Sequence, residues 1–218
     1  MELREDTLRV RRTARYYTAG PPPGEARAAW VVLHGYGQRA DDFAAQFAAV
    51  VEAGDCVVAP EALSRFYPEG TRGRVGASWM TRAHREAEIA DYLAYLDALV
   101  ERLFGERPLP MHVLGFSQGA ATAARWAARR LGRDDSVQSL TLWAGAVPPD
   151  VTPAALAGPE LTLVAGMQDA YVPPQRMGAQ RKRLDEADVA YDVLRFEGGH
   201  RLDDNTLARL VERRRSES

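Results

Sequence analysis

The pentapeptide Gly115-Phe116-Ser117-Gln118-Gly119 lies between an apolar run at 111–114 and an alanine-rich segment at 120–131. This order predicts a strand, a sharp turn and a helix, with Ser117 on the turn. A side chain at either glycine would crowd the neighbouring strand or helix. The turn would expose the serine hydroxyl beside the unpaired amides that begin the helix, and such amides stabilise a negative oxygen. Ser117 is therefore the leading candidate for a nucleophile, with a purely structural Gly-Ser turn as the alternative.

The composition indicates a globular protein. Of the 218 residues, 46% are hydrophobic, which is enough for one sizeable core, so we expect a single domain over residues 1–218. The 28 Lys and Arg residues nearly balance the 30 Asp and Glu residues, and the net charge is −2. This balance argues against a nucleic-acid-binding protein and against a polybasic membrane anchor.

Three features predict a cytoplasmic location. Cys56 is the single cysteine, so no intramolecular disulfide can form. The first residues lack the apolar core of a signal peptide, and no stretch approaches the roughly 20 apolar residues that cross a bilayer. We therefore expect a protein without a membrane span, in which Cys56 is a small buried apolar residue.

Strands and helices are expected to alternate along the chain. The expected strands lie at 29–33, 56–59, 111–114, 139–143, 161–165 and 191–196, with one or two edge strands within 7–18. The expected helices lie at 41–53, 85–104, from 118 onward, at 175–187 and at 203–214. This alternation predicts a mostly parallel sheet covered by helices on both faces. Ligand sites in such sheets gather at the carboxyl ends of the strands.

A serine hydroxyl becomes a good nucleophile when a base, usually an imidazole held by a carboxylate, takes its proton. The chain has four histidines. We interpret His112, inside a strand, as structural, His84 as a solvated or capping residue before a helix, and His34 as the brace of a loop. His200 follows the last strand after two glycines, on a turn that can reach the carboxyl edge of the sheet, so we predict it as the base.

The acidic residue whose carboxylate holds the imidazole is expected after a strand that lies between Ser117 and His200 in the sequence. Asp169 closes such a segment, and Asp150, which follows the preceding strand, is the second candidate. The order Ser117, Asp169, His200 is the one found in α/β-hydrolases. Three other acids sit on or beside a predicted helix and are interpreted as surface charges: Asp185, Asp188 and Asp192.

The negatively charged oxygen of an acyl-transfer transition state needs two hydrogen-bond donors. We assign the first to the backbone N–H of Gln118, the residue after the nucleophile. We assign the second to the backbone N–H of Tyr36, in a loop after an early strand. The glycines on each side of Tyr36 let this loop approach a substrate closely.

Together these segments resemble the phospholipase/carboxylesterase family of α/β-hydrolases, which includes bacterial carboxylesterases and acyl-protein thioesterases. The resemblance extends from about residue 29 to 200 and implies a Ser-His-Asp hydrolase that needs no cofactor or metal and has no large cap domain. It rests on four ordered motifs, with Ser78-Trp79-Met80 as a further likeness: Leu33-His34-Gly35-Tyr36-Gly37, Gly115-Phe116-Ser117-Gln118-Gly119, Asp169-Ala170-Tyr171-Val172-Pro173 and Gly198-Gly199-His200.

Two positions depart from the family pattern. In the family an acidic residue usually follows the His-Gly-x-Gly loop, where this chain has Gln38. A second acidic residue commonly follows the Ser-Trp-aromatic stretch, and this chain has none at Met80-Thr81. Both positions neighbour the expected substrate entrance, so the preferred substrate stays open.

The segment 61–82 is a candidate specificity loop. In this interpretation its larger apolar side chains line an acyl or alcohol pocket: Phe66, Tyr67, Trp79 and Met80. The alternative is a partly packed surface loop whose aromatic side chains cover the edge of the sheet.

The expected activity is hydrolysis of short- to medium-chain carboxylic or thiol esters of small molecules through an acyl-Ser117 intermediate. A lysophospholipase or an acyl-protein thioesterase, which needs a longer apolar channel, is an alternative. A ligand-binding protein that has kept the fold without catalysis is another. The sequence leaves the physiological ester and the oligomeric state open, a homodimer included.

Overall fold

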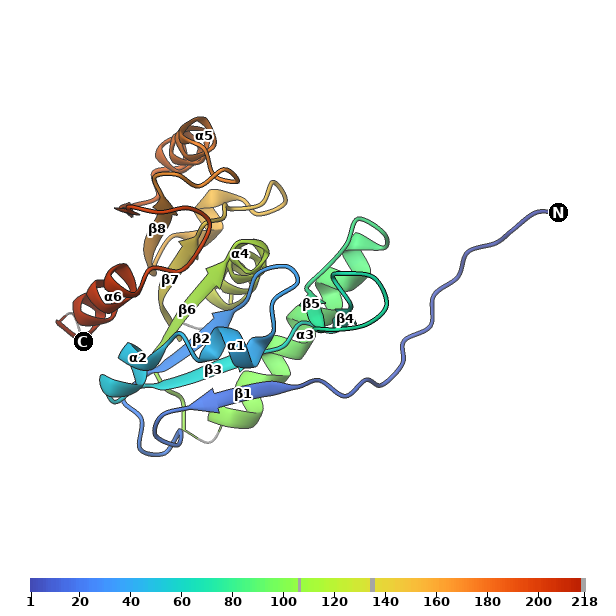
Figure 1. The fold of residues 1–218 in the computed structure, drawn as a ribbon, viewed down its shortest axis with the longest axis horizontal. Coiled ribbons are helices and arrows are strands. Elements are labelled where there is room, and N and C mark those ends of the chain that lie inside the picture. Colours follow the sequence, from blue (N-terminus) through green and yellow to red (C-terminus); the bar gives the residue numbers. More distant parts are fainter. Residues whose placement is uncertain (106, 134–135, 217–218) are drawn as a thin grey trace.

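The computed structural model describes residues 1–105, 107–133 and 136–216, and its centre is a seven-stranded sheet (Figure 1). The strand order is β1-β3-β2-β6-β7-β8-β9. Only β1 is antiparallel to its neighbour, and every other adjacent pair in this sheet is parallel. The strands are β1 Tyr16–Ala19, β2 Ala29–Leu33, β3 Cys56–Pro60, β6 Met111–Phe116, β7 Val137–Trp143, β8 Glu160–Gly166 and β9 Tyr191–Phe196. The mostly parallel sheet expected from the sequence is confirmed.

Helices cover both faces of this sheet. The helices are α1 Ala40–Ala44, α2 Ala48–Glu52, α3 Arg85–Phe104, α4 Gln118–Leu131, α5 Pro174–Asp185 and α6 Asp204–Ser216, with a short 3-10 helix at Pro153–Leu156. Apolar residues of α3, α4 and α5 share one buried cluster, and those of α1, α2 and α6 share the other. Val31 and Leu33 of β2 face the first cluster, whereas Trp30 and Val32 face the second. Successive side chains of a buried strand thus supply the two layers alternately.

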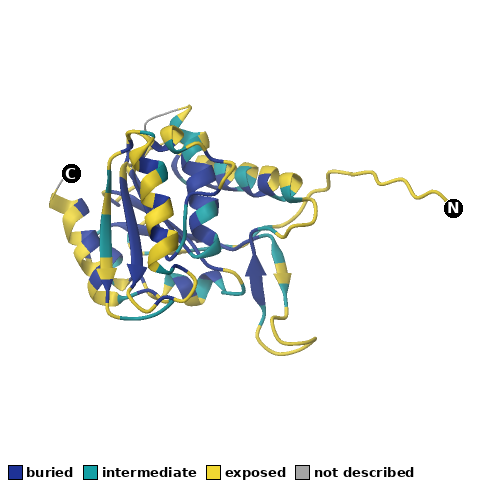
Figure 2. Cartoon of the chain, turned by 90° about the horizontal axis from the view of Figure 1, so that it is seen from above, coloured by how far each residue is buried: buried dark blue, intermediate teal, exposed yellow. Residues whose placement is uncertain are grey.

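The amino-terminal prediction holds only in part. Within the segment 7–18, the strand begins at Tyr16, and residues 1–15 form an arm without regular secondary structure that is exposed over residues 1–13 (Figure 2). The larger apolar side chains of this arm, including Leu8 and Val10, are exposed. The arm therefore has too little apolar surface in contact with the core to offset the entropy of ordering it.

Two other elements differ from expectation. The single helix expected at 41–53 is two short helices, α1 and α2, separated at 45–47. The break lets Phe47 enter the core completely and pack edge-on against Phe43. The segment 61–82 contains an antiparallel hairpin that the sequence pattern did not predict, formed by β4 Ser64–Phe66 and β5 Gly76–Ser78. Among the described residues, no helix has the length and apolar character to cross a membrane.

Two glycines allow α4 to lie directly against the sheet. A Cβ atom on Gly119 would lie 2.1 Å from the carbonyl oxygen of Leu33 and 2.6 Å from that of His34. A Cβ atom on Gly115 would lie 2.2 Å from the carbonyl oxygen of Gly119. Because all of these neighbours are backbone atoms, no side-chain rotation can relieve the overlap. The first turn of α4 can therefore pack directly against the end of β2 only because positions 115 and 119 have no side chain.

Replacing Gly119 by alanine is expected to lower the free energy of unfolding by about 3 kcal/mol, because the sheet and α4 must move apart. Gly178→Ala is the matched control, since Gly178 also lies in a helix but has no atom within 4 Å of its added Cβ. The control should raise the free energy of unfolding by roughly 0.5–1 kcal/mol. Urea unfolding of both variants checks this, and equal effects would contradict the packing account.

Candidate active site

Ser117 occupies a strained turn between β6 and α4. Its backbone has φ 53° and ψ −113°, a region that non-glycine residues rarely adopt. The Ser117 N–H donates to the carbonyl oxygen of Trp143 at the end of β7, 2.8 Å away. The turn is thus tied to the neighbouring strand, and the strain is held by the surrounding structure.

The structure brings the three candidate triad residues into hydrogen-bond contact. His200 Nε2 lies 2.9 Å from Ser117 Oγ, and His200 Nδ1 lies 2.9 Å from Asp169 Oδ2. These residues follow β6, β8 and β9, whose carboxyl ends meet at one edge of the sheet. Asp150, the second candidate for the acid, instead accepts hydrogen bonds from Arg125.

The carboxylate of Asp169 is held on both of its oxygens. Oδ1 accepts hydrogen bonds from the backbone N–H groups of Tyr171 at 2.8 Å and Val172 at 3.1 Å. Oδ2 is left to face His200, and the Asp169 side chain has no exposed surface. The loop after β8 therefore fixes both the position of the carboxylate and the ring nitrogen that it contacts.

Glycines bring the loops of Asp169 and His200 together. A Cβ atom on Gly166 would lie 2.3 Å from the carbonyl oxygen of Gly198. The same oxygen accepts a hydrogen bond of 2.9 Å from the Gln168 N–H. The turn before His200 is therefore bound directly to the loop that carries Asp169.

The imidazole of His200 lies between two aromatic rings that the sequence analysis did not assign to the site. Its centroid is 4.9 Å from that of Phe116 and 4.5 Å from that of Tyr171. Both aromatic residues are neighbours of triad members within the motifs of Ser117 and Asp169. Their adjacency in sequence was the available signal, but their contact with His200 arises only in the fold.

The two backbone amides assigned to the oxyanion hole have no hydrogen-bond acceptor within the described part of the chain. These are the N–H groups of Tyr36 and Gln118, while the neighbouring N–H groups of Gly35 and Gly37 are both bonded. The Gly35 position lies against the ring of Phe116, the residue before Ser117. Both amides are therefore free to donate to an oxygen of a ligand.

Side-chain hydrogen bonds brace the loops that carry these amides. Gln38 Oε1 accepts from the Gly35 N–H at 2.7 Å, so the residue that departs from the family pattern has a structural contact here. Gln118 Nε2 donates to the carbonyl oxygen of Met80 at 2.8 Å, and its Oε1 accepts from the Trp79 N–H at 3.0 Å. The segment after β5 is thus attached to the start of α4.

The other three histidines have contacts away from the triad. His34 Nδ1 donates to the carbonyl oxygen of Gly35, its Nε2 accepts from the Ala62 N–H, and burial lowers its pKa. His112 contacts Ser139, and burial lowers the pKa of His112 to about 4. His84 is half-exposed before α3 and pairs with Glu5.

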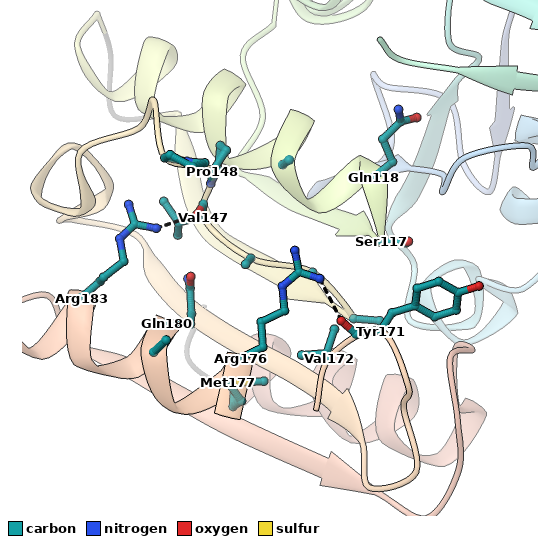
Figure 3. Close-up of a pocket in the computed structure, with 16 residues that line it drawn as sticks. Ser117, Gln118, Val147, Pro148, Tyr171, Val172, Arg176, Met177, Gln180 and Arg183 are labelled. Atoms are coloured by element: carbon teal, nitrogen blue, oxygen red, sulfur yellow. Dashed lines mark hydrogen bonds between the residues drawn. The ribbon is translucent and has the colours of Figure 1, made fainter. Parts of the chain in front are cut away.

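A pocket of about 490 Å³ opens beside Ser117 (Figure 3). Its wall is built from the start of α4, the loop 144–149 after β7, the residues 171–172 after Asp169, and α5. Ala144 begins the loop with φ 51°, and a Cβ atom on Gly145 would lie 2.3 Å from that of Ala120. The loop therefore runs close over α4 and closes one side of the pocket.

None of the four residues expected to line a substrate pocket lines this one. Phe66 and Tyr67 line a separate hollow beside β4, and Trp79 is buried with its indole N–H donating to the carbonyl oxygen of His34. Met80 is partly buried, with its carbonyl oxygen bonded to Gln118. The alternative interpretation, in which the aromatic residues of 61–82 serve packing, fits this arrangement better.

The comparisons with known proteins agree with this arrangement. Residues 26–206 match the family described as serine hydrolase (FSH1). A comparison with curated protein sequences found no match.

Solved structures of three esterases or thioesterases have the same fold. Esterase PE8 is 22% identical, with a TM-score of 0.72 over 93% of this chain and 98% of its own. A carboxylesterase from Mesorhizobium loti is 21% identical, with a TM-score of 0.72 over 94% of this chain and 95% of its own. Acyl-protein thioesterase 2 from Zea mays is 18% identical, with a TM-score of 0.70 over 94% of this chain and 99% of its own. Because the family match covers most of the length, from residue 26 to 206, this chain belongs to the serine hydrolase family.

Proposed function

We propose that this serine hydrolase cleaves short- to medium-chain carboxylic or thiol esters through an acyl intermediate on Ser117. The observation that carries the proposal is the continuous hydrogen-bonded line from Ser117 Oγ through His200 to Asp169, with 2.9 Å at both contacts. This arrangement supplies a nucleophile, a base and a group that orients the base.

The reaction begins when His200 Nε2 takes the proton of Ser117 as Oγ attacks the acyl carbon. The carbonyl oxygen becomes negatively charged and is stabilised by the N–H groups of Tyr36 and Gln118. As the bond to the leaving group breaks, His200 returns the proton to that group and the acyl-Ser117 ester remains. Water then attacks this ester with His200 again as the base, which releases the acid and restores Ser117.

Asp169 orients the imidazole and stabilises its charged form during each proton transfer. Its Oδ2 requires the proton on Nδ1, which leaves Nε2 free to accept from Ser117. The two backbone N–H groups on Oδ1 prevent the carboxylate from turning away.

The pocket beside Ser117 supports shorter acyl groups over the long apolar chains of a lysophospholipase or an acyl-protein thioesterase. It has about 490 Å³ of space, and its wall includes Arg176, Gln180 and Arg183. An acyl chain longer than the apolar part of the wall, which includes Val147, Val172 and Met177, would have to bury methylene groups against these charged and polar side chains, which costs free energy.

Ser117→Ala is expected to lower kcat/KM for p-nitrophenyl butyrate by at least about 10⁴-fold, because no other group in the proposed mechanism forms the acyl intermediate. The release of p-nitrophenol measures this, and circular dichroism verifies that the variant is folded. Equal rates for the variant and the wild type would contradict the proposal.

Asp169→Asn is expected to lower kcat by about 10³–10⁴-fold. The asparagine can keep both backbone hydrogen bonds on its oxygen, but its NH₂ group would then face His200 Nδ1 and favour the tautomer that cannot take the proton of Ser117. Asp188→Asn is the matched control, since Asp188 is exposed in the turn after α5 and its left-handed backbone suits asparagine. Steady-state kinetics that show similar losses in both variants would remove Asp169 from the mechanism.

Activity is expected to fall at acid pH because a protonated His200 cannot accept the proton of Ser117.

The free energy of unfolding is also expected to fall at acid pH. The pKa of His112 is lowered to about 4 from 6.5, so between these values the unfolded chain binds the proton more readily than the native one. The free energy of unfolding therefore decreases as pH falls through this window, by up to about 3 kcal/mol.

The two acid effects can be separated by recording kcat/KM and circular dichroism over the same pH range. We expect kcat/KM to fall while the circular dichroism signal is still native. An acid-independent kcat/KM in the folded protein would contradict the role of His200.

A further inference from the structure

The pocket beside Ser117 has a cationic wall that the proposed mechanism does not use. Arg176, Gln180 and Arg183 all line the pocket and are spaced four and three residues apart on α5, so they share one face of this helix. In Figure 3 the side chains of Gln180 and Arg183 extend from α5 toward the loop that carries Val147 and Pro148. No Asp or Glu is among the residues that line the pocket.

The charges of the two arginines are not neutralised within the described part of the chain. Arg176 Nη1 donates to the carbonyl oxygen of Tyr171 at 3.0 Å, and Arg183 Nη1 donates to that of Val147 at 2.9 Å. Arg125 on α4 differs, because its guanidinium pairs with the carboxylate of Asp150 at 2.7 Å and 2.8 Å. The pocket therefore combines two positive charges with neutral acceptors, which leaves a positive potential for an anion.

Gln180 provides an independent indication of a ligand. Only 5% of this residue is exposed, and its Nε2 is a buried donor that has no hydrogen-bond partner among the described residues. An unpaired buried amide costs free energy unless an acceptor satisfies it. A substrate oxygen in the pocket would be such an acceptor once the Gln180 amide turns its Nε2, which has no exposed surface in this structure, toward the cavity.

The cationic wall is connected to the reacting atoms through one residue. Arg176 is bonded to the carbonyl oxygen of Tyr171, and the ring of Tyr171 lies against the imidazole of His200. Ser117 lines the same pocket as Arg176. A substrate that is attacked by Ser117 can therefore extend along α5 within a single cavity.

We propose, on the basis of acyl transfer at Ser117, that the preferred substrate is a half-ester of a dicarboxylic acid. The free carboxylate of its acyl part binds to Arg176 and to the amide of Gln180, since its two oxygens match a guanidinium edge and one N–H donor. The methylene groups between the ester and the carboxylate lie against Val147, Val172 and the buried Met177. Hydrolysis releases the dicarboxylic acid and the alcohol.

The test compares two p-nitrophenyl esters that have the same acyl chain and differ in charge. One is mono-p-nitrophenyl adipate, which carries a free carboxylate, and the other is methyl p-nitrophenyl adipate, in which that carboxylate is esterified. We expect the wild type to have a kcat/KM about 10-fold or more higher for the charged ester, because a charge-assisted hydrogen bond has about this effect.

Variants assign the preference to the cationic wall. Arg176→Gln and Gln180→Leu should each reduce the ratio of the two kcat/KM values, by about 10-fold for Arg176→Gln, mainly through a higher KM for the charged ester. Lys182→Gln is the control, since Lys182 is a cation of α5 that is 77% exposed and does not line the pocket. The control should keep the wild-type ratio.

Equal kcat/KM values for the two esters in the wild type would overturn the inference, and so would an unchanged ratio in Arg176→Gln. In either case, release of p-nitrophenol from methyl p-nitrophenyl adipate would still uphold the proposed function. If Ser117→Ala cleaved the methyl ester as fast as the wild type, the proposed function itself would fail, and the inference with it.

Discussion

The site depends on the close backbone contact between the end of β2 and the start of α4. Gly119 makes this contact possible, because the carbonyl oxygens of Leu33 and His34 occupy the space that any side chain at 119 would need. The contact holds the end of β2, which leads into the loop with the free N–H of Tyr36, against the first turn of α4, which begins with the free N–H of Gln118. A fold with a wider separation of β2 and α4 would keep Ser117 but lose the pairing of these two donors.

A second backbone contact joins the loops that carry the other two residues of the proposed triad. Gly166 at the end of β8 touches Gly198 after β9, and this contact brings the loops of Asp169 and His200 together. Since both strands are parallel to β6, their carboxyl ends meet Ser117 at one edge of the sheet. Two glycine contacts thus hold together the loops, far apart in sequence, that carry the proposed nucleophile, base and acid and the two proposed oxyanion donors.

The parts that could be predicted from the sequence are those with a local signal. The helix at 85–104 and the strands at 29–33 and 191–196 have the predicted bounds, because the periodicity of apolar residues reports which side of an element is buried. Ser117 and His200 could be placed at one edge because each lies in the loop or turn after a strand of a parallel sheet.

The remaining features result from tertiary contacts that leave no local pattern. The break between α1 and α2 follows from the burial of Phe47 against its neighbours, whereas the periodicity of 41–53 is that of a continuous helix. The pocket is lined by α5 and the loop 144–149, which meet only in the folded chain. The sequence pattern instead favoured the segment 61–82 as the pocket wall, because its aromatic side chains are apparent in the sequence. Arg176 differs from many other arginines of this chain in having no carboxylate partner among the described residues, and that difference exists only in the folded structure.

The central claim is that the geometry at the end of β6 makes Ser117 a reactive nucleophile. Mass spectrometry after treatment with a fluorophosphonate tests it most directly, because this reagent forms a covalent bond with a serine only when a base and an oxyanion hole activate that serine. We predict one stoichiometric adduct on the peptide that contains Ser117, and none in Ser117→Ala. A wild-type protein that is folded but unlabelled, or labelled equally in Ser117→Ala, would contradict the claim.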